Sequence, residues 1–331
     1  MFLFGGEILN TIDFKFYLNY TDYDSIRNRR LAPLQNYQTT KVDLIRCAYT
    51  VGLSANLIKL LPIELKRHRG AIIDAYLNFT TSKIQFKERN FKFLEQSEKT
   101  SIMYSFGMIF AQSYMQRHYK IRHLMHLKSS CVSHYPQGRT PDLWGVDLST
   151  RKSYLVEAKG TSEPGYFFDK GIIKDAIDQL NSIDLIEFHV GTRSRNFWGN
   201  ELEKIAIGSH PNKVWEVTQQ IIDPTEGENI RIKIYGEDLI KEYYNNILKT
   251  IESYSKEIYY INGLEIIGVY VSELEVKIGI LKVLYDILMG ERNEENIYDQ
   301  VNDILDDYLE GFLETSNNYM GLDGIYIETY N

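Results

Sequence analysis

The stretch GRTPDLWGVDLSTRKSYLVEAKG, residues 138–160, contains an apolar segment that ends in two charged residues. These are the carboxylate of Glu157 and the ammonium group of Lys159, separated by one alanine. Each of its two halves is predicted to form a β-strand. The turn-forming residues between them predict an antiparallel hairpin centred on Thr150 and Arg151. Burying a charge is costly unless the charge is paired or holds a metal. Glu157 and Lys159 therefore mark this hairpin as a place where chemistry is expected.

The predicted hairpin gathers three charged side chains. Its register places Asp142 opposite Lys159, and Trp144 opposite Glu157. Side chains alternate between the two faces of a strand, so Glu157 and Lys159 share a face. Directly opposed residues lie roughly 4.5 to 5.5 Å apart, and diagonal ones about 7 to 8 Å. Asp142, Glu157 and Lys159 are therefore expected to converge.

Two carboxylates at such a distance repel each other unless a cation lies between them. Carboxylate oxygens are the protein ligands that magnesium prefers, often in combination with substrate phosphate. A bound metal activates water for attack on phosphorus, and a nearby lysine can orient the water or stabilise the transition state. The residue types alone fit this chemistry and a purely structural pair of Asp142 with Lys159 equally well.

The elements around the hairpin have a definite order. An apolar helix is predicted within the stretch 95–119, with Thr100 or Ser101 as its N-cap, and a strand over 121–127. After the hairpin, apolar residues at helical spacing predict an amphipathic helix over 172–183, and a further strand follows over 185–192. The order is thus helix, three strands, helix, strand.

A Pro-Asp pair ending at Asp142, followed by Glu157, Ala158 and Lys159 in this order of elements, resembles the PD-(D/E)xK, or restriction-endonuclease-like, nuclease superfamily. The resemblance implies an α/β fold whose core is a mixed β-sheet flanked by helices. It also implies an endonuclease that hydrolyses phosphodiester bonds of DNA with Mg²⁺ or Mn²⁺ as cofactor.

The resemblance assigns roles to individual residues. Asp142 and Glu157 match the metal-binding acids, the backbone carbonyl of Ala158 matches a further metal ligand, and Lys159 matches the catalytic lysine. Members of the superfamily often carry another acid on the first helix, for which Glu98 is the first candidate here and Glu95 the second. Gln179 and Lys174, on the second helix, occupy positions of supporting polar residues or of a solvated helix face.

Three regions are expected along the chain. Residues 1–95 form an N-terminal α+β region with possible substrate or partner contacts, 96–195 the nuclease core, and 196–331 an α+β region with an acidic helical tail. In the last region, Asn262-Gly263 predicts a hairpin turn. Ser272 and Glu275 have the spacing of a capping box, which predicts that a helix starts there.

Charge is distributed unevenly. The chain carries a net charge of −8, but the segment from Glu291 onward carries −10, so the preceding residues sum to +2. Basic clusters at 27–30 and 66–70, and a segment containing Arg193, Arg195 and Trp198, are candidate nucleic-acid contacts or ordinary surface. The acidic tail favours a protein partner, and the resemblance to the nuclease superfamily implies that a homo-oligomer is also expected.

Composition narrows the function classes. There is no basic leader or membrane-length apolar run, and two cysteines are too few for a disulfide framework, so a cytoplasmic protein without a membrane segment is expected. His126, Cys131 and His134 lack a fourth ligand for structural zinc. No phosphate-cradling glycine loop is visible.

Two functions from different classes follow from these observations. The first is a DNA endonuclease, which by analogy resembles the effector subunit of a prokaryotic anti-phage defence or restriction system. The second is a non-catalytic binding or assembly module that keeps the nuclease fold within a larger complex.

Overall fold

The structure is a computed structural model. It describes residues 10–17, 34–51, 63–80, 82–127, 132–133, 140–147, 150–224, 231–272, 274–290, 296–309, 313–314 and 318–330. The basic cluster at 27–30, Cys131 and His134 lie outside the described residues. Side chains are described within these ranges except at 16–17, 63–67, 132–133 and 313–314.

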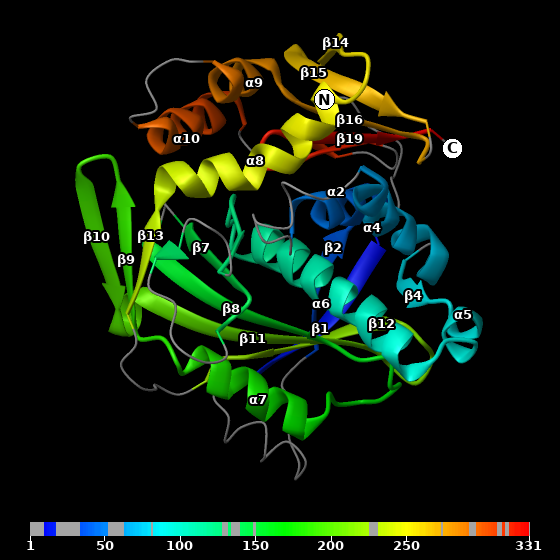
Figure 1. Ribbon diagram of the computed structural model, residues 1–331. Coiled ribbons are helices and arrows are strands. Elements are labelled where there is room, and N and C mark those ends of the chain that lie inside the picture. Colours follow the sequence, from blue (N-terminus) through cyan, green and yellow to red (C-terminus); the bar gives the residue numbers. More distant parts are fainter. Residues whose placement is uncertain are drawn as a thin grey trace, which may run out of the picture.

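A seven-stranded mixed sheet forms the centre of this α/β protein (Figure 1). Its strands are, in spatial order, β2 (Gln35–Thr39), β1 (Asn10–Tyr17), β12 (Val217–Ile222), β11 (Leu202–Pro211), β8 (Lys152–Gly160), β7 (Leu143–Asp147) and β5 (Met125–His126). The pairs β1–β12 and β8–β11 are parallel, and the other neighbours are antiparallel. Strands from all three expected regions of the chain therefore share one sheet.

Helices α6 (Gln96–His118) and α7 (Lys170–Leu180) cover opposite faces of this sheet (Figure 1). Helix α6 is buried along most of its second half, in agreement with its apolar sequence. It begins earlier than predicted, because Glu95 and Glu98 form a reciprocal capping box there, so the expected N-cap at Thr100 or Ser101 is wrong. Helix α7 is amphipathic and directs Ile173, Ala176, Ile177 and Leu180 into the core.

Smaller elements surround the central sheet. A four-stranded sheet has the order β10 (Arg193–Trp198), β9 (Leu185–Val190), β13 (Arg231–Tyr235) and β6 (Val132–Ser133), and β10 is followed by the short helix η1 (Gly199–Glu201). The N-terminal elements are α2 (Lys41–Thr50), α4 (Ile63–Tyr76), the hairpin β3 (Leu77–Phe79) and β4 (Ile84–Phe86), and α5 (Glu88–Lys92).

The C-terminal part contains an antiparallel six-stranded sheet, and helices α8 to α10 lie beside it (Figure 1). The strand order is β14 (Glu257–Ile261), β15 (Leu264–Val271), β16 (Val276–Leu281), β19 (Ile325–Thr329), β18 (Asn318–Met320) and β17 (Leu313–Glu314). The helices are α8 (Gly236–Glu252), α9 (Lys282–Met289) and α10 (Ile297–Tyr308).

Two predictions for this part of the chain have different outcomes. The Asn262-Gly263 hairpin is confirmed, since both residues have positive φ between β14 and β15. The helix predicted from Ser272 is wrong. Residues 276–281 form the central strand β16 instead, and the helix starts only at Lys282. Glu275 has a φ of +52°, which interrupts a helix, and the sequence VKIGIL favours a strand because its branched residues alternate.

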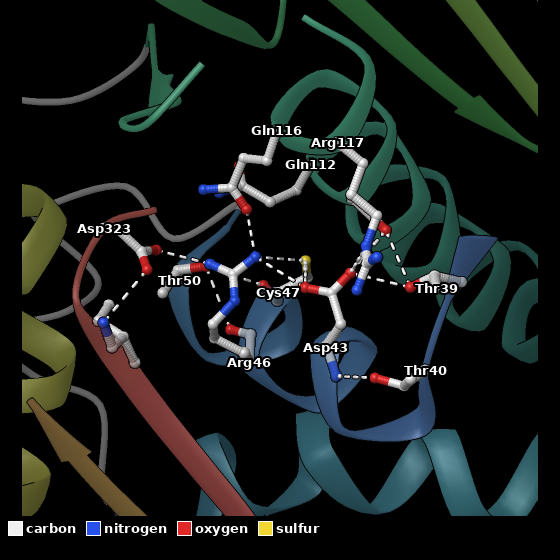
Figure 2. A network of polar contacts seen from close by, with 12 residues as sticks. Thr39, Thr40, Asp43, Arg46, Cys47, Thr50, Gln112, Gln116, Arg117 and Asp323 are labelled. Carbon is white, nitrogen blue, oxygen red and sulfur yellow. Dashed lines mark hydrogen bonds and ion pairs between the residues drawn. The ribbon is translucent and has the colours of Figure 1, made fainter. Parts of the chain in front are cut away.

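A buried polar cluster joins the C-terminal sheet to the N-terminal helices (Figure 2). Arg46 of α2 lies between Asp43 (2.9 Å) and Asp323 (2.6 Å), and all three side chains are inaccessible to solvent. Arg117 of α6 reaches the other oxygen of Asp43 through Nε at 2.7 Å. Gln116 accepts a hydrogen bond from Arg46. We refer to Asp43, Arg46, Arg117 and Asp323 as the buried charge cluster.

Candidate active site

The hairpin β7–β8 forms in a register that differs from the predicted one. Leu143 pairs with Val156, which places Asp142 opposite Glu157 and not opposite Lys159. The prediction was wrong by two residues because Asp147 pairs with Lys152, so the connection between the strands is centred one residue earlier than the predicted centre between Thr150 and Arg151. A shift of two preserves the face of every side chain. The acids therefore still meet, and they meet more directly than predicted.

Asp142 and Glu157 are locked together by reciprocal bonds to backbone groups. The Asp142 N–H donates to Glu157 Oε2 at 3.0 Å, and the Ala158 N–H donates to Asp142 Oδ2 at 3.1 Å. Both acids are buried, and Glu157 exposes only 1% of its surface. One oxygen of each carboxylate is thus committed to positioning the pair.

The second oxygen of Glu157 meets two polar side chains. Lys159 Nζ donates to Oε1 at 2.5 Å. Gln179 reaches up from α7: its amide nitrogen donates to the same oxygen at 2.6 Å, and its amide oxygen accepts from Lys159 Nζ at 3.2 Å. This is the amide orientation that satisfies both neighbours. Asp142, Glu157, Lys159 and Gln179 therefore form one connected group.

The electrostatics of this group are unbalanced. Burial, and next the negative charge of Asp142, raise the pKa of Glu157 to about 8, although Lys159 acts in the opposite direction. If both carboxylates were ionised, one ammonium group would leave a negative charge uncompensated, and the raised pKa means that Glu157 instead keeps its proton at neutral pH in the absence of a further cation. Perturbation of this kind is concentrated at functional sites, although structural ion pairs also produce it.

Two glycines bring α6 against the end of β8. A Cβ on Gly160 would lie 1.9 Å from the Met103 carbonyl oxygen, and one on Gly107 would lie 2.9 Å from the backbone of Lys159. Only glycine permits this approach. A glycine within an apolar helix was the sequence signal for this contact, and it was not used.

Tyr104, one residue after Met103 on α6, was not identified from the sequence. Burial raises its pKa to about 12, with a smaller contribution from the charges of Asp142 and Glu157 and an opposing one from Arg69. The phenol is therefore neutral at ordinary pH, yet 44% of the residue is exposed. Tyr104 thus lies within electrostatic reach of the two acids and also faces solvent.

Other predicted site residues are not brought to this group. Glu98 is exposed and accepts a hydrogen bond from the Glu95 N–H at the start of α6, and Lys174 lies on the exposed face of α7. His126 is buried on β5, where it pairs with Leu143. Within the part of the chain that the structure describes, no three acids, histidines or cysteines gather to hold a metal.

The candidate nucleic-acid contacts on β10 have partners of their own. Arg193 pairs with Asp299 of the acidic helix α10. Arg195 pairs with Glu201 at 3.3 Å, and its guanidinium lies 4.7 Å from the ring centroid of Phe197. Trp198 is exposed at the end of the strand. Both arginines are thus paired with acidic residues of this chain.

The donor set at Asp142 and Glu157 suits a hard divalent cation. Magnesium is commonly bound by one or two carboxylates and completed by water and substrate phosphate, so a third acid is not required. A divalent ion would supply the positive charge that lets both carboxylates be ionised together. Mg²⁺ or Mn²⁺ would be held by the two carboxylates and by the backbone carbonyl of Ala158, the residue that follows Glu157 on β8.

No family model, curated protein or solved structure matches this chain. No helix among the described residues is long and apolar enough to cross a membrane.

Proposed function

We propose that this chain is a metal-dependent endonuclease that hydrolyses phosphodiester bonds of DNA, with a restriction-endonuclease-like core. The observation that carries the proposal is the direct opposition of Asp142 and Glu157 on β7 and β8, with Lys159 and Gln179 on the free side of Glu157. Two adjacent acids with a lysine beside them are an arrangement suited to metal-dependent phosphodiester hydrolysis.

Each residue has a defined task in this reaction. A divalent ion held by Asp142 and Glu157 would lower the pKa of a water molecule and neutralise charge on the phosphoryl oxygens. Lys159 Nζ, the most solvent-accessible group of the set, orients the water or donates to a phosphoryl oxygen. Gln179 holds the Lys159 ammonium group and the Glu157 carboxylate at fixed separation.

One observation favours the alternative of a non-catalytic nuclease-fold module. The direct contact of Lys159 with Glu157 partly neutralises the acid that should hold the metal. In such a module the four side chains would stabilise the hairpin, and the chain would contribute its surface to an assembly. A net charge of −8 also opposes unaided DNA binding, so a protein partner or a second copy is part of the proposal under both functions.

The test is cleavage of supercoiled, linear duplex and single-stranded DNA in Mg²⁺, Mn²⁺ or EDTA. Glu157→Gln and Lys159→Ala should each lower the rate by about 10² to 10⁴, the range for loss of a positioned acid–base or electrostatic group. Lys174→Ala, on the exposed face of α7, is the matched control and should cleave normally. Cleavage that survives both site substitutions would refute the site.

The same variants separate the two functions when no cleavage is seen. A nuclease awaiting a partner should still bind Mn²⁺ through Asp142 and Glu157, and Glu157→Gln should abolish that binding. Wild-type protein that neither cleaves nor binds Mn²⁺ would support the module and contradict the nuclease.

A further inference from the structure

The segment that follows β8, residues 161–168, presents two aromatic rings beside two lysines. Tyr166 is 60% exposed and Phe167 37% exposed. Lys213 Nζ lies 4.4 Å from the ring centroid of Tyr166, and Lys15 Nζ lies 4.9 Å from that of Phe167. We call Lys15, Tyr166, Phe167 and Lys213 the lysine–aromatic platform.

The platform is built into the sheet. The Thr161 N–H donates to the Ser209 carbonyl at 3.1 Å, and the Gly165 N–H donates to the Pro211 carbonyl at 3.0 Å, so the segment runs alongside β11. Phe168, beneath the exposed rings, packs over Gly208, where an added Cβ would lie 2.8 Å from the ring. The exposed rings therefore have a fixed backbone under them.

The carbonyl of Tyr166 is held from the neighbouring strands. It accepts hydrogen bonds from Lys15 Nζ at 3.2 Å and from Gln220 Nε2 at 3.3 Å. Lys15 thus serves both the Tyr166 backbone and the Phe167 ring. The cations and rings of the platform are placed together by β1, β11 and β12 and not by the 161–168 segment alone.

The strand register connects the platform to the candidate active site. Lys159 on β8 pairs with Gly208 on β11, Gly208 pairs with Gln220 on β12, and Gln220 pairs with Lys15 on β1. Paired residues point to the same face, so Lys159 and Lys15 lie in one row on one face of the sheet. Three strand spacings of about 4.8 Å separate them by roughly 14 Å. In duplex DNA, where the rise is 3.4 Å per nucleotide, that distance corresponds to about four steps, so it spans a few nucleotides of the substrate strand.

Rings beside cations suit unpaired nucleotides. Every base has a face that stacks on an aromatic ring, and an ammonium group next to the ring pairs with the adjoining phosphate. Bases inside a duplex are already stacked and do not offer that face. An acidic peptide would also contact the lysines, but the row that links them to Lys159 favours the strand whose phosphate lies at the active site.

We propose that the lysine–aromatic platform binds unpaired nucleotides of the substrate strand, a few nucleotides from the phosphate at Lys159. The proposal rests on the nuclease function proposed above and adds to it the substrate class. DNA with a single-stranded segment, as an overhang or a flap, is the substrate that this surface recognises.

The test is binding of fluorescent oligonucleotides to the full chain in EDTA, where metal-dependent cleavage does not occur. The probes are a single strand, a blunt duplex and a duplex with a single-stranded overhang of one sequence. The double variant Tyr166→Ala/Phe167→Ala should bind the single strand and the overhang about tenfold more weakly, with the blunt duplex unchanged. Tyr166→Phe, which keeps the ring, should bind normally, as should Tyr260→Ala, which removes an equally exposed ring on β14.

The lysines have a separate signature. Lys15→Gln/Lys213→Gln should reduce the slope of log affinity against log salt concentration by about 1.4 for the single strand, since each phosphate contact contributes about 0.7. Thermal unfolding of each variant checks that the fold is retained. Equal binding of the single strand by the wild type and by the double aromatic variant would overturn the proposal. Loss of a co-purifying protein from the double aromatic variant, with DNA binding unchanged, would overturn it as well.

The two proposals fail in different ways. Glu157→Gln should lose cleavage and keep oligonucleotide binding, whereas the platform variants should lose binding in EDTA. Cleavage by the wild type without any preference for unpaired nucleotides would overturn the platform and leave the nuclease standing. Oligonucleotide binding by a wild-type protein that neither cleaves DNA nor binds Mn²⁺ would overturn the nuclease and leave the platform standing.

Discussion

Two groups of buried acids in this protein differ in how fully nearby cations balance them. In the buried charge cluster, burial acts to raise the pKa of Asp43, but Arg117 and Arg46 outweigh it and hold that pKa well below its usual range. At the candidate active site, burial and Asp142 raise the pKa of Glu157 to about 8 despite Lys159. Both acids are almost inaccessible to solvent, so burial alone does not distinguish them.

The difference lies in the number of cations. The cluster has two aspartates and two arginines in direct contact, and Figure 2 shows the Arg46 guanidinium between Asp43 and Asp323. The site has two acids and a single lysine. A buried network in which cations match the acids serves to hold elements together, whereas two acids with one ammonium group are suited to a divalent ion, which would let both acids ionise. The comparison thus separates a structural polar group from a candidate functional one by charge.

The largest effect is expected from breaking the cluster. Arg46→Met removes the cation shared by Asp43 and Asp323, and leaving buried charges without their partner typically costs about 3 to 5 kcal/mol. Urea unfolding at pH 7 measures this loss as a lower midpoint. A loss below about 1 kcal/mol would show that the cluster does not hold α2 against the C-terminal sheet.

A smaller loss is expected from disturbing the backbone beside the site. Gly160→Ala places a methyl group where the Met103 carbonyl lies, so α6 and β8 must separate, at a cost of about 1 to 3 kcal/mol. Because Gly160 follows Lys159, cleavage should fall together with stability. Ser105→Ala, at a partly exposed position of α6, is the control. Unchanged stability would mean that the close approach is not required.

The charge imbalance itself predicts a pH dependence. Between about pH 4.5 and 8 the unfolded chain ionises Glu157 while the folded chain keeps it protonated, so this residue makes folding less favourable as pH rises. In EDTA, wild-type protein should lose roughly 1 to 3 kcal/mol relative to Glu157→Gln from pH 5 to pH 8. Urea unfolding at a series of pH values measures the difference. Parallel curves for the two proteins would contradict the imbalance.

The smallest effect on stability is expected from a surface ion pair, which serves as the reference for both groups of buried acids. Lys282 pairs with Asp286 at 2.5 Å on the surface of α9, and exposed pairs of this kind contribute little to stability because solvent screens the charges. Lys282→Met should therefore leave the urea midpoint nearly unchanged. A loss comparable to that of Arg46→Met would show that burial is not what makes the cluster stabilising.

The sequence by itself determined the features that depend on periodicity along one segment. The alternation around Glu157 and Lys159 placed both on one face, the apolar pattern predicted the α6 helix, and Asn262-Gly263 predicted its hairpin. Gln179 was selected by its place on α7, and the structure brings it to Glu157. Such patterns are local because side-chain direction follows from the backbone repeat alone.

Only the tertiary structure decided what depends on pairing between distant segments. The four-residue connection between β7 and β8 set the register of Asp142, and neighbouring strands made 276–281 a strand where a capping pattern had predicted a helix. The row from Lys159 to Lys15 joins strands that lie far apart in the chain. Arg46 and Asp323 meet for the same reason. These contacts are determined by the burial and hydrogen bonding of whole sheets, which no local repeat contains.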